Sequence, residues 1–392
     1  MNSKYRRTMY ACFVGYIVQA VVNNFAPLLF LTFQESYGIS IAKITFLVTF
    51  NFILQLAVDL ASTVVIDKIG YRVSVVAAHF LAAAGLVALA VFPEVFPDPF
   101  AGLLTAVVIY AVGGGLLEVV ISPMVEACPS DNKEAAMSLL HSFYCWGQVG
   151  VVLLSTLFFV FAGIEHWKLL ALLWAAIPFV NGLVCTRVPI ATLLPEDEKG
   201  LSMKGLFSKR KFWVFVLLMF CAGSCEMAVS QWASAFAEKG LKVSKTVGDL
   251  AGPMLFAGMM GLSRTLYSRA GEKLVLQKAM LFSGMLCLAS YLLIALSPLP
   301  WLGLAGCGLC GFSVGLLWPG TYSLASAQIA KGGTAMFAFL ALAGDLGCSL
   351  GPTLVGRISA LYGDNLKAGM LSAVAFPAVL LIALLLNRRS SS

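Results

Sequence analysis

The sequence predicts an all-α membrane protein whose twelve transmembrane helices form two pseudo-symmetric bundles of six. Hydrophobic residues make up 60% of the 392 residues and charged residues only 11%, and the mean hydropathy is +0.90. Ordinary soluble domains do not have such a composition. Apolar stretches long enough to cross a bilayer recur along the chain. They cover residues 9–33, 42–66, 73–93, 100–126, 135–162, 167–187, 212–237, 246–267, 275–297, 300–329, 334–361 and 366–387.

The positions of Lys and Arg predict the orientation of these helices. With the N-terminus inside, most of the 26 Lys and Arg residues face the cytoplasm, as the positive-inside rule requires. We therefore expect a multi-pass monomer in the lipid bilayer of the inner (plasma) membrane, with both termini cytoplasmic. The net charge of +7 then reflects topology, because the basic residues are spread along one membrane face. A nucleic-acid partner is not expected.

A long polar connection divides the predicted helices six and six. We expect an N-terminal bundle over residues 1–187, a cytoplasmic linker over 188–211 and a C-terminal bundle over 212–392. An internal repeat supports this division, because residues 67–72 after the second predicted helix line up with residues 268–273 after the eighth. Both segments are short, charged turns centred on a glycine.

The first of these turns carries a recognisable pattern. Asp67, Lys68, Gly70 and Arg72 match G-x-x-x-D-R-x-G-R, with Lys for the first Arg and Thr63 for the leading Gly. Together with the six-plus-six arrangement, this resembles the major facilitator superfamily of transporters. The resemblance implies an inner gate at these four residues, where a carboxylate near a helix N-terminus contributes about 0.3–1 kcal/mol. A plain positive-inside turn is the alternative interpretation.

Two acidic residues lie inside apolar stretches. Glu118, in the fourth stretch, and Glu226, in the seventh, each occupy positions where an ionisable side chain costs about 2.5–3.5 kcal/mol on insertion scales. We expect both to bind protons or substrate, although a structural Glu bonded to a neighbouring helix is the alternative. His141 is expected to hydrogen-bond Glu118 or to relay a proton, with simple packing as the alternative.

Three short segments give a closer resemblance, to the fucose-permease-like sugar:proton symporters. They are residues 115–123, 138–147 and 223–232, which resemble that group's G-L-x-E-x-x-x-N-P, L-N-L-x-H-S-F-x-x-x-G and G-x-E with a following Trp. The chain also departs from the group. Asn24 stands where those proteins carry an acid thought to take part in proton coupling, and Ser122 replaces the Asn. Coupling is therefore expected at Glu118, Glu226 or another acid.

Uncharged polar and aromatic residues inside the predicted helices are candidates for lining the substrate site, with interhelical hydrogen bonding or packing as the alternative. Besides the two acids, these candidates are Asn23, Asn24, Asn51, Gln55, Trp146, Gln231, Trp232 and Trp318. Further charged residues inside helices are assigned to gate or bundle ion pairs: Asp59, Arg264 and Asp345. Gly347 and Gly351, in the eleventh stretch, indicate close helix packing.

These features predict a secondary active transporter with alternating access, most simply proton-coupled uptake of a small polar solute such as a sugar. The alternative is a facilitator or exporter of amphipathic organic compounds, because the predicted cavity is poor in charge. An enzyme is not expected, since no catalytic motif occurs in a convincing context. The ten cysteines lack metal-ligand spacing, so no metal or cofactor is expected. The predicted partners are the solute and protons.

Overall fold

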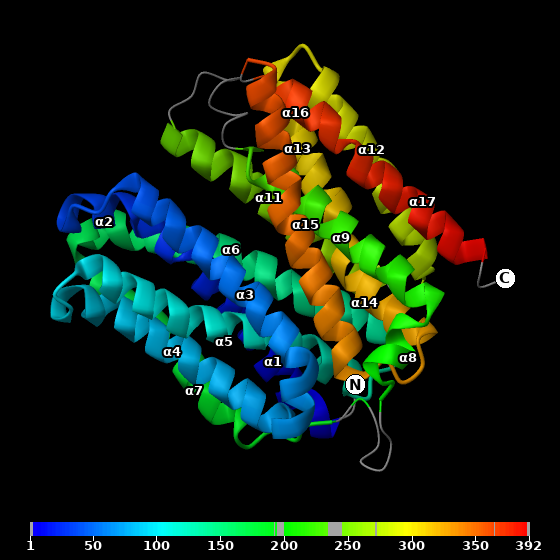
Figure 1. Cartoon of the computed structure of the whole chain (residues 1–392), viewed down its shortest axis with the longest axis horizontal. Coiled ribbons are helices and arrows are strands. Elements are labelled where there is room, and N and C mark those ends of the chain that lie inside the picture. The colour runs from blue at the N-terminus through cyan, green and yellow to red at the C-terminus, as the bar shows by residue number, and fades with distance from the viewer. Residues whose placement is uncertain are drawn as a thin grey trace. The chain divides into compact units, whose positions relative to one another are not determined.

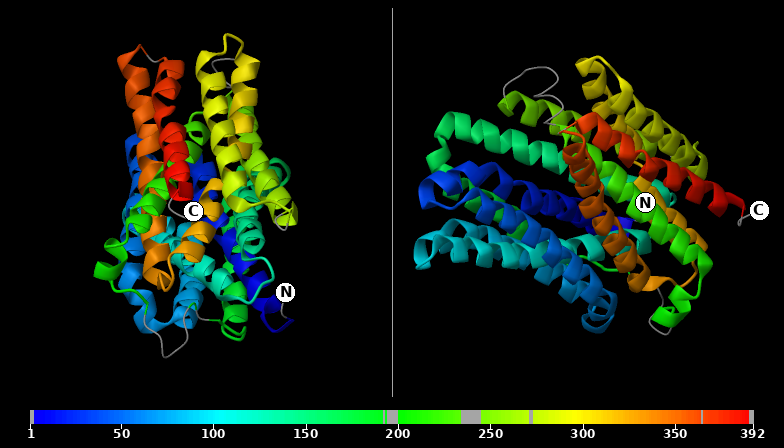
Figure 2. Two further views of the ribbon diagram at one scale, coloured as in Figure 1. Left: turned by 90° about the vertical axis from the view of Figure 1, so that its right-hand side faces the viewer. Right: turned by 45° about the horizontal axis from the view of Figure 1, so that its top comes forward.

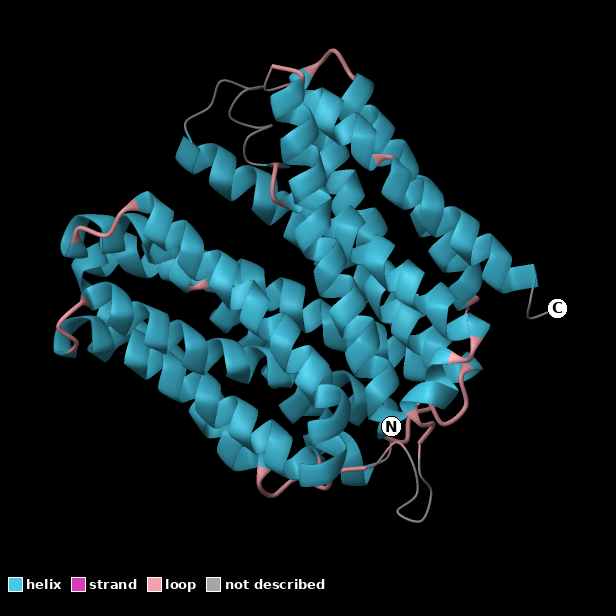
Figure 3. Cartoon of the chain, viewed as in Figure 1, coloured by secondary structure: helices cyan, strands magenta, loops and turns pink. Residues whose placement is uncertain are grey.

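A computed structural model of the chain describes residues 3–191, 193, 200–233, 245–270, 273–363 and 365–389. All regular secondary structure in these ranges is helical, and none of the residues described there lies in a β-strand (Figure 3). Ten helical segments of this part of the chain are long and apolar enough to cross a membrane. The prediction of an all-α, multi-pass membrane protein is therefore confirmed. The predicted number of twelve spanning helices stays a prediction.

The chain splits into two compact units, of which unit 1 contains Met1–Asp131, Trp146–Glu198 and Gly333–Ala338. Its helices are η1 (Ser3–Tyr5), α1 (Arg6–Asn24), η2 (Ala26–Leu29), α2 (Phe30–Tyr37), α3 (Ile41–Ile69), α4 (Tyr71–Val95), α5 (Pro99–Ala127), the second part of α6 (Lys133–Ala162), η3 (Ile164–His166) and α7 (Trp167–Cys185). Within this unit α4 packs along α5 and α7, while α1 and α3 pack on α5 (Figure 1). The core of unit 1 therefore surrounds α5.

Unit 2 contains Asn132–Cys145, Lys199–Gly332 and Phe339–Ser392. Besides the start of α6, its helices are α8 (Met203–Phe207), α9 (Arg210–Ser230), α11 (Lys245–Ala270), α12 (Leu276–Leu296), α13 (Pro300–Val314), α14 (Leu317–Gln328), most of α15 (Gly333–Leu361), α16 (Leu366–Ala373) and α17 (Ala375–Arg389). Here α12, in yellow, lies beside the red α17 (Figure 2), and α13 packs on α11 and α12.

Two helices contribute to both units. The start of α6 belongs to unit 2, where Ser138 Oγ donates a hydrogen bond to the carbonyl oxygen of Arg264 at 2.8 Å. The start of α15 belongs to unit 1, where the hydroxyl groups of Tyr71 and Thr334 share a hydrogen bond. The units are thus defined by packing rather than by order along the chain, and the domain boundaries expected from the sequence stay a prediction.

Local sequence explains several helix ends. Gly70, with φ of 84°, joins α3 to α4 in a backbone conformation that residues with a Cβ rarely adopt. The side chain of Ser40 caps α3 by accepting from the backbone N–H of Lys43 at 3.4 Å, and that of Asp98 caps α5 through Phe100 at 3.0 Å. These ends orient α3 and α5 within unit 1.

Three of the expected helices are interrupted within the described residues, the first of them, 9–33, where η2 separates α1 from α2. The stretches 300–329 and 366–387 each form one candidate span, but α13 and α14 replace one continuous helix and α16 and α17 replace the other. In both cases a proline follows the interruption within a few residues, Pro319 in α14 and Pro377 in α17. Proline has no N–H to donate and its ring clashes with the preceding turn, which accounts for an interruption of the helix at these places.

The part of the predicted linker that covers residues 200–211 is packed on unit 2. It contains the short helix α8, which Ser202 caps by accepting from the N–H of Gly205 at 3.1 Å. Phe207 at the end of α8 packs against Phe212 and Phe339, with ring centroids 5.8 and 5.1 Å apart. These contacts anchor the linker to α9 and α15.

Candidate functional site

Glu118 lies in the interior of α5 and is held by α1. Its Oε2 accepts a hydrogen bond from Nε2 of Gln19 at 2.7 Å, and Gln19 is only 4% exposed. One turn further along α5, the hydroxyl groups of Ser122 and Tyr16 share a hydrogen bond of 2.7 Å. Glu118 is thus a half-buried carboxylate with a neutral amide as one of its partners.

Consecutive glycines in α5 explain why its neighbours come so close. A Cβ on Gly114 would lie 3.1 Å from Cγ1 of Val22 and 3.6 Å from Nε2 of Gln55, and one on Gly115 would lie 3.1 Å from Val58. Helix backbones can approach closely where such small residues face a neighbour. The glycines therefore bring the polar residues of α1 and α3 next to Glu118's helix.

The candidate amides of α1 and α3 form a second polar group in unit 1. Nε2 of Gln55 donates to Oδ1 of Asn23 at 2.8 Å, whereas Nδ2 of Asn24 donates to the carbonyl oxygen of Ala20 within its own helix at 2.9 Å. Asn51 is 8% exposed. Asn23 and Asn51 both line a pocket formed by residues of unit 1.

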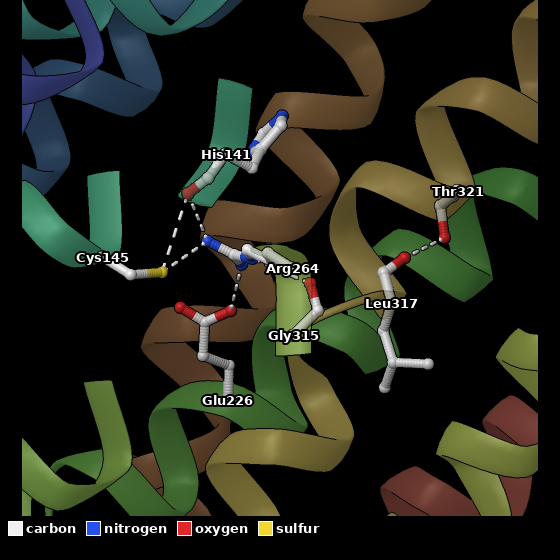
Figure 4. Close-up of polar contacts among 7 residues, drawn as sticks. All are labelled: His141, Cys145, Glu226, Arg264, Gly315, Leu317 and Thr321. Atoms are coloured by element: carbon white, nitrogen blue, oxygen red, sulfur yellow. Dashed lines mark hydrogen bonds and ion pairs between the residues drawn. The ribbon is translucent and has the colours of Figure 1, made fainter. Parts of the chain in front are cut away.

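Arg264 of α11 is the centre of a buried polar cluster in unit 2 (Figure 4). Its Nε donates to the carbonyl oxygen of Gly315 at 2.7 Å. Its Nη1 donates to the carbonyl oxygen of His141 and to Cys145 Sγ, both at 3.0 Å. Its Nη2 lies 3.6 Å from Oε2 of Glu226, while Arg264 itself is 3% exposed. The structure thus brings Arg264, a predicted gate residue, next to Glu226, a predicted proton carrier.

The interruption between α13 and α14 explains one of these contacts. The helical partner of the Gly315 carbonyl would be the N–H of residue 319, and Pro319 has none. Arg264 supplies the missing donor. Gly315 also lets α11 come close, because a Cβ there would lie 2.9 Å from the carbonyl oxygen of Met260. A guanidinium at membrane depth is costly unless it is paired, and these contacts satisfy it.

The side chain of His141 packs against an aromatic group. Its ring lies 5.9 Å from that of Tyr322, and the ring of Trp318 meets Tyr322 edge-on at 6.5 Å. Trp318 is 8% exposed and lies against Gly344, where a Cβ would be 2.2 Å from the indole. Trp318 is therefore a well-packed interior residue of unit 2.

Three other candidates come from the seventh stretch and from α6. Trp232 donates its Nε1–H to the carbonyl oxygen of Pro352 at 3.2 Å, and Gln231 is exposed at the end of α9. Trp146 is 43% exposed. A substrate-lining role for these three residues stays a prediction.

The predicted gate turn has one well-defined set of contacts. Asp67 and Lys68 are exposed at the end of α3. The guanidinium of Arg72 donates to carbonyl oxygens at and just after the end of α7, at distances of 2.7–3.1 Å: those of Cys185, Thr186 and Val188. Carbonyls at a helix C-terminus lack intrahelical partners, so Arg72 completes the end of α7 in unit 1. A gating role stays a prediction.

Two further predicted gate residues are acids inside helices. Asp59 in α3 is fully buried and Asp345 in α15 is partly buried. Within the ranges that the structure describes, no group of three or more His, Cys, Asp or Glu side chains could hold a metal ion.

A buried polar network in unit 1 was not predicted from the sequence. His79 is fully buried in α4, and its Nδ1 lies 2.7 Å from the carbonyl oxygen of Val75, which can only accept. Nδ1 therefore carries the proton, and Nε2 accepts from Nδ2 of Asn181 at 2.7 Å. Nδ2 of Asn181 also donates to the carbonyl oxygen of Ala11 at 2.9 Å. The signal in the sequence was a His and an Asn inside apolar stretches, where polar side chains need hydrogen-bond partners.

We expect Asn181→Leu to destabilise the protein by about 1–3 kcal/mol, because it leaves the buried His79 Nε2 without a donor. Thermal unfolding of the purified protein measures the effect. Gln277→Leu is the matched control, since Nε2 of Gln277 is buried without a hydrogen-bond partner and its loss should be neutral. Equal stability of the two variants would contradict the role of the network.

The fold and the site together point to one class of protein. A multi-pass helical membrane protein with carboxylates and an arginine inside its helices is typical of proteins that move polar solutes or ions across the bilayer. The sequence profile of the Major Facilitator Superfamily matches residues 11–352. The chain belongs to this superfamily and is therefore a membrane transporter rather than an enzyme.

Individual relatives are more distant. The membrane protein MosC of Rhizobium meliloti is 22% identical over 263 residues, which cover 66% of this chain and 62% of MosC, less than two thirds of that protein. A crystal structure of the E. coli fucose:proton symporter FucP has 17% identity and a TM-score of 0.82, covering 97% of this chain and 98% of FucP. The human organic anion transporter MFSD10 has 15% identity and a TM-score of 0.77, covering 98% and 100%. These two structures establish the fold alone.

Proposed function

We propose that this protein is a proton-coupled transporter that takes up a small polar solute such as a sugar. Twelve helices cross the inner membrane as two bundles of six, with both termini in the cytoplasm. Alternating access then exposes a central site to either side in turn. The E. coli symporter with a similar fold is a fucose:proton symporter, which supports the proposal by analogy.

The observation that carries this proposal is the environment of Glu118. The ionised carboxylate accepts from Nε2 of Gln19, while Oε1 of the same amide is buried without a hydrogen-bond partner. A protonated Glu118 has an O–H to donate, and Oε1 is a spare acceptor beside it. One glutamine therefore offers hydrogen bonds to both protonation states, which favours reversible proton binding.

Other residues take supporting roles in the proposal. Glu226, with His141 in the same cluster, is the second candidate for proton coupling. Its protonation, however, leaves Arg264 without the carboxylate 3.6 Å away. Glu118 is therefore the first choice as proton carrier. The polar and aromatic candidates named from the sequence are proposed as substrate contacts.

We expect Glu118→Gln to abolish accumulation driven by a proton gradient while leaving equilibrative exchange intact. One proton entering across 100 mV supplies about 2.3 kcal/mol, or roughly fifty-fold accumulation, and a glutamine cannot carry it. The measurement is uptake of a radiolabelled monosaccharide panel into proteoliposomes, with and without an inward proton gradient.

Glu165→Gln is the matched control, because the side chain of Glu165, in η3 just before α7, is 70% exposed. Its accumulation should equal that of the wild type. Accumulation retained by Glu118→Gln would return Glu118 to a structural role and make Glu226 the next acid to neutralise.

A facilitator or exporter of amphipathic organic compounds is the second candidate. One observation favours it: position 24, which carries an acid in the fucose permeases, is an Asn whose amide bonds its own helix. The human organic anion transporter also has a similar fold. Absence of sugar transport under every gradient would favour this candidate.

A further inference from the structure

A basic and aromatic segment of unit 2 lies where α9 enters the membrane. It consists of α8 and the first turn of α9, residues 203–213, and is called the α8 patch below. The candidate span formed by α9 begins at Arg210, and α8 lies at this end of α9 (Figure 1). The α8 patch is therefore at a membrane surface, on whichever side of the membrane that surface lies.

The α8 patch carries four basic residues and no acidic one. Lys204, Lys209 and Arg210 are exposed, and Lys211 is half-buried. The sequence has no Asp or Glu from Gly200 to Cys225. Within the ranges that the structure describes, no acidic side chain forms an ion pair with any of the four. The patch is thus a local concentration of positive charge beside a spanning helix, which attracts anionic lipid headgroups.

Exposed apolar side chains lie among these charges. Met203, Phe207 and Trp213 are 38%, 39% and 53% exposed. Tryptophan is enriched at the membrane–water interface, where its amphipathic ring sits at the level of the headgroups. Basic residues combined with exposed Trp and Phe are typical of segments that lie in this interface. The patch can therefore contact both parts of a lipid, its headgroup and the beginning of its acyl chains.

The backbone of the α8 patch is held by contacts at both ends. Nε1 of Trp213 donates to the carbonyl oxygen of Phe207 at 2.8 Å, and the two rings lie 5.7 Å apart. These contacts close the turn that contains the consecutive basic residues 209–211. Before α8, the N–H of Leu201 donates to the carbonyl oxygen of Lys331 at 2.9 Å. Because the turn is already formed, binding an anion there costs less conformational entropy than it would in a flexible segment.

We propose that the α8 patch binds the headgroup of an anionic phospholipid such as phosphatidylglycerol. The lipid phosphate accepts charge-assisted hydrogen bonds from Arg210 and from the lysines of the patch, and the acyl chains pack on Phe207 and Trp213. A phosphatidylcholine headgroup offers the same phosphate, but the basic side chains repel its ammonium group. The proposal does not depend on transport, because the patch contains no residue assigned to the substrate site.

The test uses the full-length protein in phosphatidylcholine nanodiscs that contain a minor fraction of a lipid with brominated acyl chains, which quench nearby tryptophans. The brominated lipid is either phosphatidylglycerol or phosphatidylcholine, at the same mole fraction. The signal of Trp213 is the difference between the wild type and Trp213→Phe. It should give an association constant for phosphatidylglycerol about ten-fold above that for phosphatidylcholine, as expected for about two or three exposed ion pairs.

Salt provides a second readout on the same samples. The Debye length falls from about 10 Å at about 0.1 M salt to about 3 Å at about 1 M. The preference of Trp213 for brominated phosphatidylglycerol should therefore fall toward one as NaCl is raised over this range. Quenching by brominated phosphatidylcholine should change little, because its apolar contacts are not screened.

Two variants and a soluble competitor complete the experiment. The set Lys209→Gln, Arg210→Gln and Lys211→Gln should abolish the preference and keep the quenching by brominated phosphatidylcholine. The matched control is the set Lys209→Arg, Arg210→Lys and Lys211→Arg, which keeps the three charges and should keep the preference. Glycerol 3-phosphate in large excess should leave the preference unchanged, because it has no acyl chains to contact the aromatic residues.

Several outcomes would overturn the proposal. They are equal quenching by the two lipids in the wild type, a preference that survives high salt or the loss of the three charges, and a preference lost in the charge-conserving set. Displacement by glycerol 3-phosphate would overturn it as well, because the patch would then be a site for a free phosphate compound. The comparison of lipids needs no change to the basic residues, and no outcome depends on transport.

Discussion

Arg264→Met is expected to lower the free energy of unfolding by about 3–5 kcal/mol, the effect of removing one partner from a buried charged pair. The change leaves the largely buried carboxylate of Glu226 without the guanidinium 3.6 Å away. It also removes the guanidinium N–H groups that donate to the carbonyl oxygens of Gly315 and His141. Denaturant unfolding of the purified protein in micelles measures the change.

A double variant separates charge from packing. Adding Glu226→Gln to Arg264→Met removes the uncompensated carboxylate. The double variant should therefore lose less free energy of unfolding than the two single variants lose in sum. Arg264→Lys keeps a charge, but its single ammonium group cannot reach both carbonyl oxygens as the planar guanidinium does. We therefore expect an intermediate loss of unfolding free energy. Wild-type stability of Arg264→Met would show that the cluster contributes nothing to the fold.

Hydropathy and charge were sufficient to predict the class of fold. The spanning helices follow from composition, because only helices satisfy the backbone within a bilayer without a closed barrel. The interruption before Pro319 was not predicted, although proline chemistry explains it. An apolar stretch keeps its hydropathy across such a break, so a pattern of apolar residues alone does not reveal it.

The candidate site was predicted only in part. Glu118, Glu226 and Arg264 were singled out correctly as charged residues inside helices, since each one stands out in an apolar stretch. Their partners were not predicted. Gln19 contacts Glu118 because α1 packs on α5. The Gly315 carbonyl contacts Arg264 because α11 packs on the α13–α14 junction. A single sequence predicts which residues lie inside a helix more readily than which residue of another helix they contact.

The close packing expected from glycines in the eleventh stretch is confirmed within unit 2. A Cβ on Gly347 would lie 2.1 Å from the carbonyl oxygen of Phe220, and one on Gly351 would lie 2.7 Å from that of Ser224. Both contacts are with backbone atoms of α9, which cannot rotate away as a side chain can. The glycines therefore fix the distance between α9 and α15.

We expect Gly347→Ala to destabilise unit 2 by about 3 kcal/mol, at the upper end of the cost of overpacking a well-packed interior. Gly258→Ala in α11 is the matched control, because nothing lies within 4 Å of a Cβ at that position. Alanine is the better helix former by up to about 1 kcal/mol, so the control should be neutral or stabilising. Thermal unfolding of both variants in the same detergent provides the measurement. The same substitution thus has opposite expected signs at two helical positions, and only the distance to the neighbouring backbone distinguishes them. A stable Gly347→Ala variant would mean that α9 and α15 separate at little cost.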